Sequence, residues 1–218
     1  MLVKTFGSAV YGIKATTITI EVNISQGVNF YLVGLPDVAV KESQQRIESA
    51  LQTHGYRMPG KKVVINMAPA DIRKEGSAYD LPLAIGILAG SEQIMPDKLS
   101  EYVIMGELSL DGSLQPIKGV LPIALQAREE GFKGIVLPLQ NAREAAVVEG
   151  IKVFGEEFAV NVNGSFGNIF RLVKEVNDLP YIFRAIYFNT FYNCCFARVL
   201  KRQNYSFESF LSGLKRYR

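Results

Sequence analysis

The sequence predicts an α/β (α+β) fold in which helices pack on a mixed sheet. Strand-like and helix-like segments follow one another along residues 1–155 in the order β-β-β-α-β-α-β-β-α-β-α-β. Residues 81–89 (LPLAIGILA) contain no charged or polar side chain, and a helix that is apolar on all sides is normally buried. The expected architecture is therefore a sheet with helices layered on it and one helix at its centre.

Three strands are expected before residue 34, followed by a long helix. Residues 16–24 (TTITIEVNI) alternate β-branched with other residues, and residues 29–33 form a third apolar run after a turn at Gly27. Asp37 is a good N-cap for a helix over residues 38–54. One face of this helix carries Val40, Ile47, Ala50, Leu51 and His54.

Shorter strands and helices surround the apolar segment in the rest of the domain. Asp80 is expected to cap the apolar helix, with Pro82 in its first turn. Asn141 is expected to cap a later helix, with Glu144 three residues on in a capping-box-like pairing. The other expected elements are strands at 62–67, 102–107, 112–114, 134–137 and 152–154, a turn at residues 111–112, and a helix at 119–130.

The composition indicates one sizeable domain and argues against several classes of protein. The chain has 218 residues, of which 48% are hydrophobic, and no uninterrupted apolar run reaches the length of a membrane span. The first residues lack the pattern of a signal peptide, so the cytoplasm is the expected compartment. Cys194 and Cys195 are adjacent and form no disulfide framework. His54 is the single histidine, which argues against histidine-based metal sites and Ser–His chemistry.

Charge and aromatic content change near residues 158–163. Up to Val160 there are 15 Lys and Arg against 18 Asp and Glu, and from Asn161 onward there are 9 against 3. Thirteen of the 23 Phe and Tyr also lie after residue 160. We therefore expect a domain at 1–158 and a divergent, basic, aromatic tail at 159–218. The sequence leaves three origins of the tail open: a shifted reading frame, a disordered extension, or a genuine alternative C-terminus.

Residues 55–62 (GYRMPGKK) nearly match a phosphate-binding loop, but we interpret them as an ordinary basic turn. Lys62 stands where that motif needs Ser or Thr. The segment also follows a helix and enters a strand, whereas a phosphate-binding loop follows a strand and opens a helix.

The loop before the apolar helix carries the other candidate side chains. It holds three carboxylates and two cations, Asp71, Glu75, Asp80, Arg73 and Lys74. A salt-bridged or solvated loop is the simpler interpretation of this group, and a ligand or partner site is the alternative. Ser77 lies at the mouth of the helix, but a nucleophilic serine needs a base within hydrogen-bond reach. Neither His54 nor Lys74 suits that role.

Four phrases in the sequence resemble a known family. They are VGLPDVAVKES (33–43), NMAPADIRKEGSAYDLPLA (66–84), GELSLDG (106–112) and LPLQNAREAAVV (137–148). Over residues 1–155 the chain resembles the N-terminal domain of the YifB/ComM family of magnesium-chelatase-like AAA+ ATPases. In that family the domain is similar to the Lon protease catalytic domain, on the ribosomal S5 domain 2-like fold. The resemblance therefore implies this fold, and the expected order of strands and helices agrees with it.

The likeness to Lon can be tested at the two catalytic positions. Lon-type peptidases carry a serine in a D-G-P-S-A-G-like segment and a lysine in the helix after a P-I-G-G-like turn. Aligning the first on residues 75–80 (EGSAYD) puts Ala78 at the serine position, with Ser77 one residue early. Aligning the second on residues 116–119 (PIKG) puts Ile123 at the lysine position. Since serine catalysis needs both groups, the resemblance implies a peptidase-like scaffold without peptidase chemistry.

The resemblance also implies a function. Full-length relatives of the competence type are hexameric, ATP-driven helicases that act on branched DNA in recombination and natural transformation. Their ATP and Mg²⁺ bind in a motor that follows this domain, and this sequence contains none of the motor's motifs. We therefore expect the non-catalytic N-terminal module of such an ATPase, with no catalytic, cofactor or metal site in this chain. The expected partners are further copies or an AAA+ hexamer, and DNA, with no membrane partner.

Five cations on two loops, which we expect to be neighbours, are the candidates for contact with DNA or a partner. They are Arg57, Lys61, Lys62, Arg73 and Lys74. The alternative is solvated loop charge, which the net negative charge up to Val160 favours. Three further interpretations stay open: a relic of a Lon-like serine peptidase, an interaction or structural domain, and a truncated gene product with no independent function.

Overall fold

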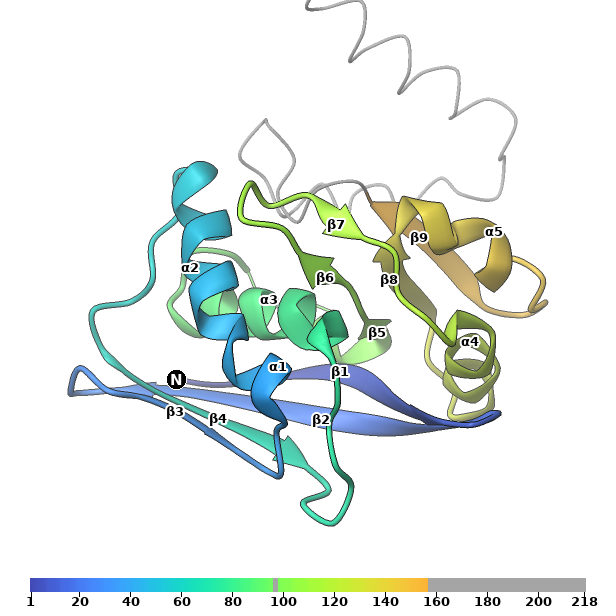
Figure 1. Ribbon diagram of the computed structural model, residues 1–218, viewed down its shortest axis with the longest axis horizontal. Helices are drawn as coiled ribbons and strands as arrows, with labels where there is room; N and C mark the ends of the chain where they lie inside the picture. Colours follow the sequence, from blue (N-terminus) through green and yellow to red (C-terminus); the bar gives the residue numbers. More distant parts are fainter. Residues whose placement is uncertain (96–97, 157–218) are drawn as a thin grey trace, which may run out of the picture. The chain divides into compact units, whose positions relative to one another are not determined.

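The computed structural model describes residues 1–95 and 98–156, which form a mixed sheet with helices packed against it (Figure 1). The sheet has seven strands in the order β3-β4-β2-β1-β5-β8-β9. Its strands are β1 (Leu2–Tyr11), β2 (Lys14–Ser25), β3 (Phe30–Val33), β4 (Lys62–Ala68), β5 (Tyr102–Ile104), β8 (Gly134–Pro138) and β9 (Lys152–Glu156). The pairs β1–β2 and β2–β4 are antiparallel, and the other neighbouring strands are parallel.

The remaining elements are a small hairpin and short helices. The hairpin consists of β6 (Glu107–Leu108) and β7 (Leu114–Gln115). The α-helices are α1 (Val38–Lys41), α2 (Ser43–Thr53), α3 (Asp80–Gly90), α4 (Val120–Glu129) and α5 (Ala142–Ala145). Single turns of 3₁₀ helix lie at η1 (Ser77–Tyr79), η2 (Leu99–Glu101) and η3 (Leu139–Asn141). The expected α/β class and the mixed sheet are confirmed.

The centre of the core is α3, which packs on one face of β1 and β2. All of its residues are buried, as the uniformly apolar sequence predicts. The hydroxyl of Thr5 in β1 donates a hydrogen bond to the carbonyl of Pro82 at 3.0 Å. Gly86 allows close approach, because a Cβ at this position would lie 2.7 Å from Cγ2 of Val22 in β2.

The opposite face of β1 and β2 is partly covered by α4. Successive side chains of a strand point to opposite faces of the sheet. Thr5 faces α3, so Phe6 and Ser8 point to the other face. Ser8 donates a hydrogen bond to Gln126 of α4 at 3.1 Å, and the Phe6 ring lies 5.4 Å from that of Phe132. Helices α3 and α4 thus cover opposite faces of the same sheet.

Two expected elements are divided in the structure. The helix expected over residues 38–54 is broken at Glu42 into α1 and α2, and beside the break the Ala39 carbonyl accepts a hydrogen bond from the Arg46 side chain. The single strand expected at 102–107 is wrong. The chain leaves the sheet at Gly106, whose N–H donates to the Ala78 carbonyl before α3, and it continues as the β6–β7 hairpin.

The expected capping box at Asn141 is also wrong. Its side chain bonds both the N–H and the carbonyl of Ile117, each at 2.9 Å, and makes no cap hydrogen bond. The Glu144 carboxylate accepts instead from the N–H of Leu121 at 3.2 Å. Both side chains therefore tie α5 to the start of α4 rather than closing the end of their own helix.

The tail at 159–218 and its expected boundary at residue 158 lie outside the described residues. Within residues 1–95 and 98–156, no helix is both long enough and apolar enough to cross a membrane.

Candidate functional site: a polar network at the start of the apolar helix

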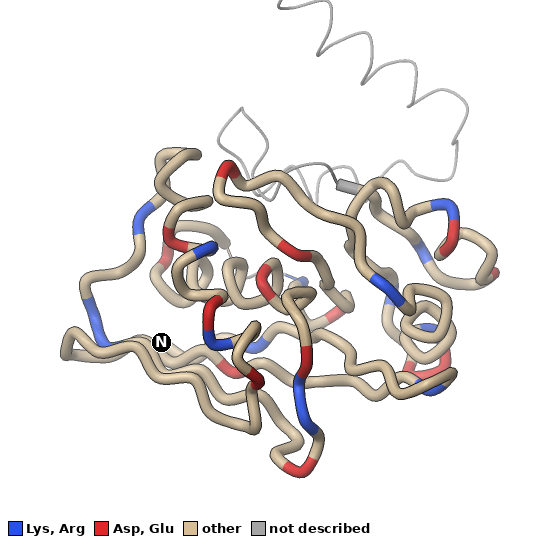
Figure 2. The backbone as a smooth tube through the Cα atoms, viewed as in Figure 1, with Lys and Arg blue, Asp and Glu red and all other residues tan. Residues whose placement is uncertain are grey.

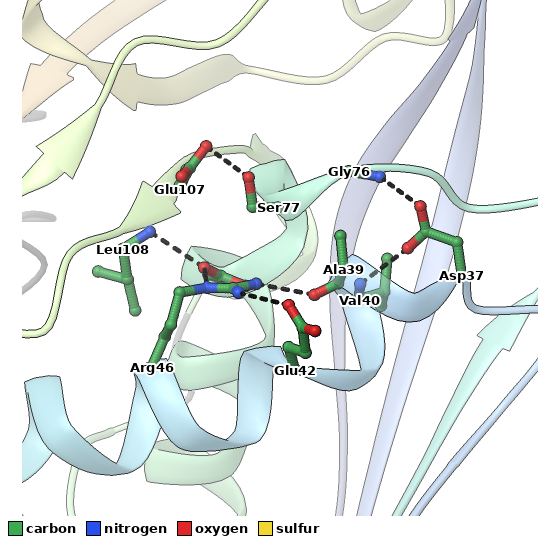
Figure 3. A network of polar contacts seen from close by, with 10 residues as sticks. Asp37, Ala39, Val40, Glu42, Arg46, Gly76, Ser77, Glu107 and Leu108 are labelled. Carbon is green, nitrogen blue, oxygen red and sulfur yellow. Dashed lines mark hydrogen bonds and ion pairs between the residues drawn. The ribbon is translucent and has the colours of Figure 1, made fainter.

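A network of polar side chains surrounds the N-terminal end of α3 (Figure 3). It joins α1, α2, the segment before α3 and β6, which are far apart in the sequence. This is also the region in which a Lon-type peptidase would carry its serine. The network is therefore the place to look for chemistry.

The centre of the network is an ion pair between Arg46 of α2 and Asp80. The guanidinium donates from Nε to Oδ2 at 2.7 Å and from Nη2 to Oδ1 at 3.0 Å. The Leu108 N–H donates to Oδ2 at 3.2 Å, and the Asp80 carboxylate is fully buried. The expected N-cap role of Asp80 is wrong, because Asp80 lies inside α3 and the cap position is Tyr79. Its carboxylate is held by the guanidinium instead.

The environment of this pair sets its protonation. Burial raises the pKa of the Asp80 carboxyl, while the hydrogen bonds and charge of Arg46 oppose that shift. The hydrogen bond to Asp80 raises the pKa of Arg46, so the guanidinium stays charged. Because both carboxylate oxygens are occupied by donors, the pair suits a structural role better than proton transfer.

Asp37 is a second connection in the network, and it confirms the expected N-cap. Its Oδ1 accepts from the Val40 N–H at 2.8 Å, which caps α1. Its Oδ2 accepts from the Gly76 N–H at 3.0 Å. Gly76 has a φ of 82°, a left-handed conformation that favours glycine. One carboxylate thus holds both the start of α1 and the segment that leads into α3.

Ala78 and Ile123, which the resemblance aligns with the Lon-type serine and lysine, lie before α3 and in α4, and Ile123 is buried. The neighbouring Ser77 hydroxyl donates a hydrogen bond to the Glu107 carboxylate. A carboxylate is a much weaker base than the amine or imidazole that activates a nucleophilic serine. Neither alanine nor isoleucine has a side chain that can act as a nucleophile or a base.

The charged loop before α3 differs in one respect from the expectation. Arg73 and Glu75 form an exposed ion pair with an Nε–Oε1 distance of 3.2 Å, as the salt-bridged interpretation predicts. Lys74, however, is fully buried, and its ammonium donates to the Pro69 carbonyl. Burial lowers the pKa of Lys74, and the charge of Asp71 opposes this shift. The expectation that Lys74 is solvated and can reach a phosphate is therefore wrong.

The five candidate cations do not form one cluster (Figure 2). Arg57, Lys61 and Lys62 lie before or at the start of β4, whereas Arg73 and Lys74 follow its other end. Seven residues of strand separate these ends by roughly 20 Å at about 3.3 Å per residue. The expectation that their loops are neighbours is wrong. Contact of the individual residues with DNA stays a prediction.

The basic turn is the first of these loops, and it follows the end of α2. Residues 55–61 run from the end of α2 into β4, as the interpretation of a basic turn requires. His54 is the C-cap residue of α2, and its Nε2 lies 2.8 Å from the Asp111 carbonyl, so it joins the helix end to the β6–β7 hairpin. In the part of the chain that the structure describes, no group of three His, Cys, Asp or Glu side chains could hold a metal ion.

Arg46 and Glu107 were not predicted from the sequence. One signal pointed to a partner for Asp80: an aspartate at the start of a wholly apolar, buried helix must be neutralised or paired. The identity of that partner depends on how α2 crosses α3, and the sequence pattern does not contain this information.

Comparison with known proteins decides the family. The family model described as subunit ChlI of Mg-chelatase matches residues 20–141. YifB of Escherichia coli strain K12 is 45% identical over 143 residues, and the competence protein ComM of Haemophilus influenzae is 42% identical over 144 residues. The chain belongs to the YifB/ComM family of Mg-chelatase-like proteins. The matches cover 65% and 66% of this chain, but only 28% of each relative.

The likeness to Lon covers about two thirds of this chain. Lon protease 2 of Bacillus subtilis is 25% identical over 166 residues, covering 67% of this chain and 30% of that protease. The mixed sheet of this YifB/ComM-family chain thus has a Lon-like fold.

Proposed function

We propose that this chain is the non-catalytic, Lon-like N-terminal module of a YifB/ComM-type ATPase, and that it assembles or positions the motor. One observation carries the proposal: at the start of α3, Asp80, Arg46 and Asp37 hold the surrounding elements together by hydrogen bonds. The resemblance supports it, because it aligns Ala78 and Ile123 with the Lon-type serine and lysine. ATP, Mg²⁺ and helicase action on branched DNA belong, in this proposal, to the motor of the full-length family member. A cytoplasmic location is part of the proposal.

The absence of peptidase chemistry can be tested with a fluorophosphonate probe on the whole chain. We expect no labelling, and Ser77→Ala to behave identically. The double variant Ala78→Ser/Ile123→Lys provides a control, because it restores the Lon-like pair on the same scaffold. Labelling of the unchanged chain that disappears in Ser77→Ala would revive the peptidase alternative.

The positive part of the proposal is tested in a full-length relative. Residues 1–156 would replace the matching domain of E. coli YifB, and oligomer size and ATP hydrolysis would be compared with those of the parent. We expect both to be retained, and both to disappear when the domain is deleted. A deleted form that assembles and hydrolyses ATP like the parent would contradict a role in assembly or positioning.

Contact with the DNA backbone is a second candidate function. Arg57 and Lys61 are exposed on one segment, and Lys62 begins the strand that follows, so three cations lie close together in the chain. We expect Lys61→Ala/Lys62→Ala to weaken salt-dependent retention on DNA, with a salt slope lower by about 0.9 for each phosphate that the variant no longer neutralises. Arg73→Ala, at the other end of β4, is the matched control and should have little effect. Equal weakening by both variants would indicate non-specific charge instead.

A further inference from the structure

An exposed, largely apolar surface lies along the β3 edge of the sheet. It is bordered by Lys62 of β4, whose Nζ lies 5.4 Å from the centre of the Tyr31 ring. β3 pairs with β4 on one side, and no other described strand pairs with it. Residues 26–36 (QGVNFYLVGLP) contain no charged side chain. Large apolar residues are nevertheless exposed along and beside the strand: Val28, Tyr31, Val33, Leu35 and Val38. Natural edge strands are usually protected by short length, charge, proline or cover. β3 is short, with four residues, but it has no charge or proline within them.

The backbone of β3 has hydrogen-bonding groups directed to its outer side. The Asn29 carbonyl accepts from the Val63 N–H at 2.9 Å across the β4 side. Because successive residues of a strand direct their backbone groups to opposite sides, the N–H and C=O groups of Phe30 and Leu32 point to the outer edge. Tyr31 and Val33 place their side chains on the face of the sheet opposite α3, where they are 45% and 46% exposed.

We propose that β3 pairs antiparallel with β3 of a second copy of this chain, about a two-fold axis at Leu32. In this register Leu32 faces Leu32 of the other copy as a hydrogen-bonded pair. Tyr31 then lies opposite the other copy's Val33, and Val33 opposite its Tyr31, as closely spaced non-hydrogen-bonded pairs. Aromatic and β-branched residues form favourable cross-strand pairs. The strand is therefore complementary to itself in one register.

The conformation of Leu35 supports an external contact independently. Its φ is 57°, in the left-handed region that a leucine adopts rarely, and its side chain is 55% exposed. Glycine or asparagine would suit this backbone better and would expose less apolar surface. A strained, exposed leucine beside the edge strand fits a contact made by another molecule.

The charge pattern favours a second copy over a charged partner. A two-fold contact brings the same surface against itself, so charges at its centre would repel their copies. Residues 30–33 carry no charge, and Lys62, which lies over the Tyr31 ring, belongs to β4, one strand away from the axis. The other sheet edge, β9, carries the exposed Lys152 and lacks this property. The inference concerns the edge of the sheet and does not rest on the proposed function.

Sedimentation of the full chain over a range of concentrations tests the proposal. We expect a monomer–dimer equilibrium that Val33→Lys weakens roughly tenfold or more, because each new ammonium then approaches the other copy's Tyr31, over which the ammonium of Lys62 already lies. Leu35→Gly should weaken it too, without lowering the midpoint of thermal unfolding. Ile13→Lys is the matched control, since Ile13 is 91% exposed outside this surface, and should leave the equilibrium unchanged. A chain that stays monomeric, or dimers unaffected by Val33→Lys, would overturn the proposal.

Hydrogen exchange distinguishes strand pairing from other association. As the concentration rises, the amides of Phe30 and Leu32 should become protected, while those of Tyr31 and Val33, which face β4, should change little. Protection of Phe30 and Leu32 at all concentrations in a monomer would show that another part of the chain covers β3, and would contradict the second copy. Dimers without protection there would contradict the strand pairing.

Discussion

Asp80 and Lys74 are both fully buried, and their surroundings explain how each is tolerated. Asp80 receives two hydrogen bonds from Arg46 and one from a backbone N–H. Lys74 donates to a backbone carbonyl, and its N–H and C=O bond to the backbone of Leu35 and Asp37. At the residue scale, buried charge in this domain connects the segment before α3 to α1 and α2.

Removing one partner of the Arg46–Asp80 pair should destabilise the domain strongly. Arg46→Met leaves a buried carboxylate without its guanidinium, and we expect a decrease of about 3–5 kcal/mol in the free energy of unfolding. Urea denaturation measures this decrease. In Arg46→Met/Asp80→Leu the decrease in the free energy of unfolding should be smaller than in Arg46→Met alone, because no charge is left buried. The exposed pair supplies the control: Arg73→Met should cost less than about 1 kcal/mol.

Glu21 should contribute a small pH-dependent stabilisation. Hydrogen bonds from Asn66 and then from Lys4 hold the pKa of Glu21 below its ordinary value of 4.5. The folded state therefore favours the ionised form, so the stabilisation is complete above about pH 4.5 and disappears as the pH falls below it. The unfolding free energy of the unchanged chain minus that of Glu21→Gln should be positive at about pH 7, below about 1 kcal/mol, and should become smaller as the pH falls below about 4.5. A difference that grows on acidification would contradict this assignment.

At the scale of elements, α3 depends on two glycines that let it lie close to the sheet. A Cβ on Gly86 would lie 2.7 Å from Cγ2 of Val22, whereas a Cβ on Gly90 would lie 3.2 Å from Cδ1 of Ile24. Cγ2 belongs to a stiff, branched side chain, and Cδ1 is the end of a flexible one. The side chain beside Gly90 can therefore move aside more easily than the side chain beside Gly86.

Alanine at these positions should separate packing from helix propensity. Alanine favours a helix over glycine by about 1 kcal/mol, so Gly86→Ala would stabilise an isolated helix. In the packed domain we expect Gly86→Ala to lower the free energy of unfolding by about 1–3 kcal/mol through overpacking. Gly90→Ala should lower it less, because Ile24 can change rotamer. Thermal unfolding followed by circular dichroism compares the two, and equal effects would show that close approach to Val22 does not limit the packing.

At the scale of the described domain, the sheet is covered unequally. α3 is buried throughout on one face, while the opposite face is covered by α4 at one end and exposes Tyr31 and Val33 at β3. The apolar surface buried around α3 exceeds that around the short helices α1 and α5. Local unfolding should therefore start away from α3.

Amide hydrogen exchange should reveal this difference. We expect the amides in the second half of α3 to exchange only through global unfolding, at the free energy measured by urea denaturation. Those of α1 and α5, which are four residues long and lie at the surface, should exchange through smaller openings. Equal exchange in α3 and α5 would mean that the described domain opens as a single unit.

Much of this architecture follows from local sequence patterns. Alternation in β2, the apolar runs of β4 and α3 and the N-cap at Asp37 each depend on neighbouring residues, and each element was predicted from them. These features are encoded within one turn or strand, where periodicity and capping act.

Tertiary structure alone decided the rest. Asp80 was predicted to be an N-cap, but α2 places Arg46 against it, and Asp80 is buried. Lys74 was predicted to be solvated, but it is fully buried. The same holds for the candidate cations, which β4 separates, and for the edge exposed along β3. Each of these depends on contacts between residues distant in the sequence. The sequence determined most of the strands and helices, and packing between them determined where two of them are divided and which charges are buried, paired or exposed.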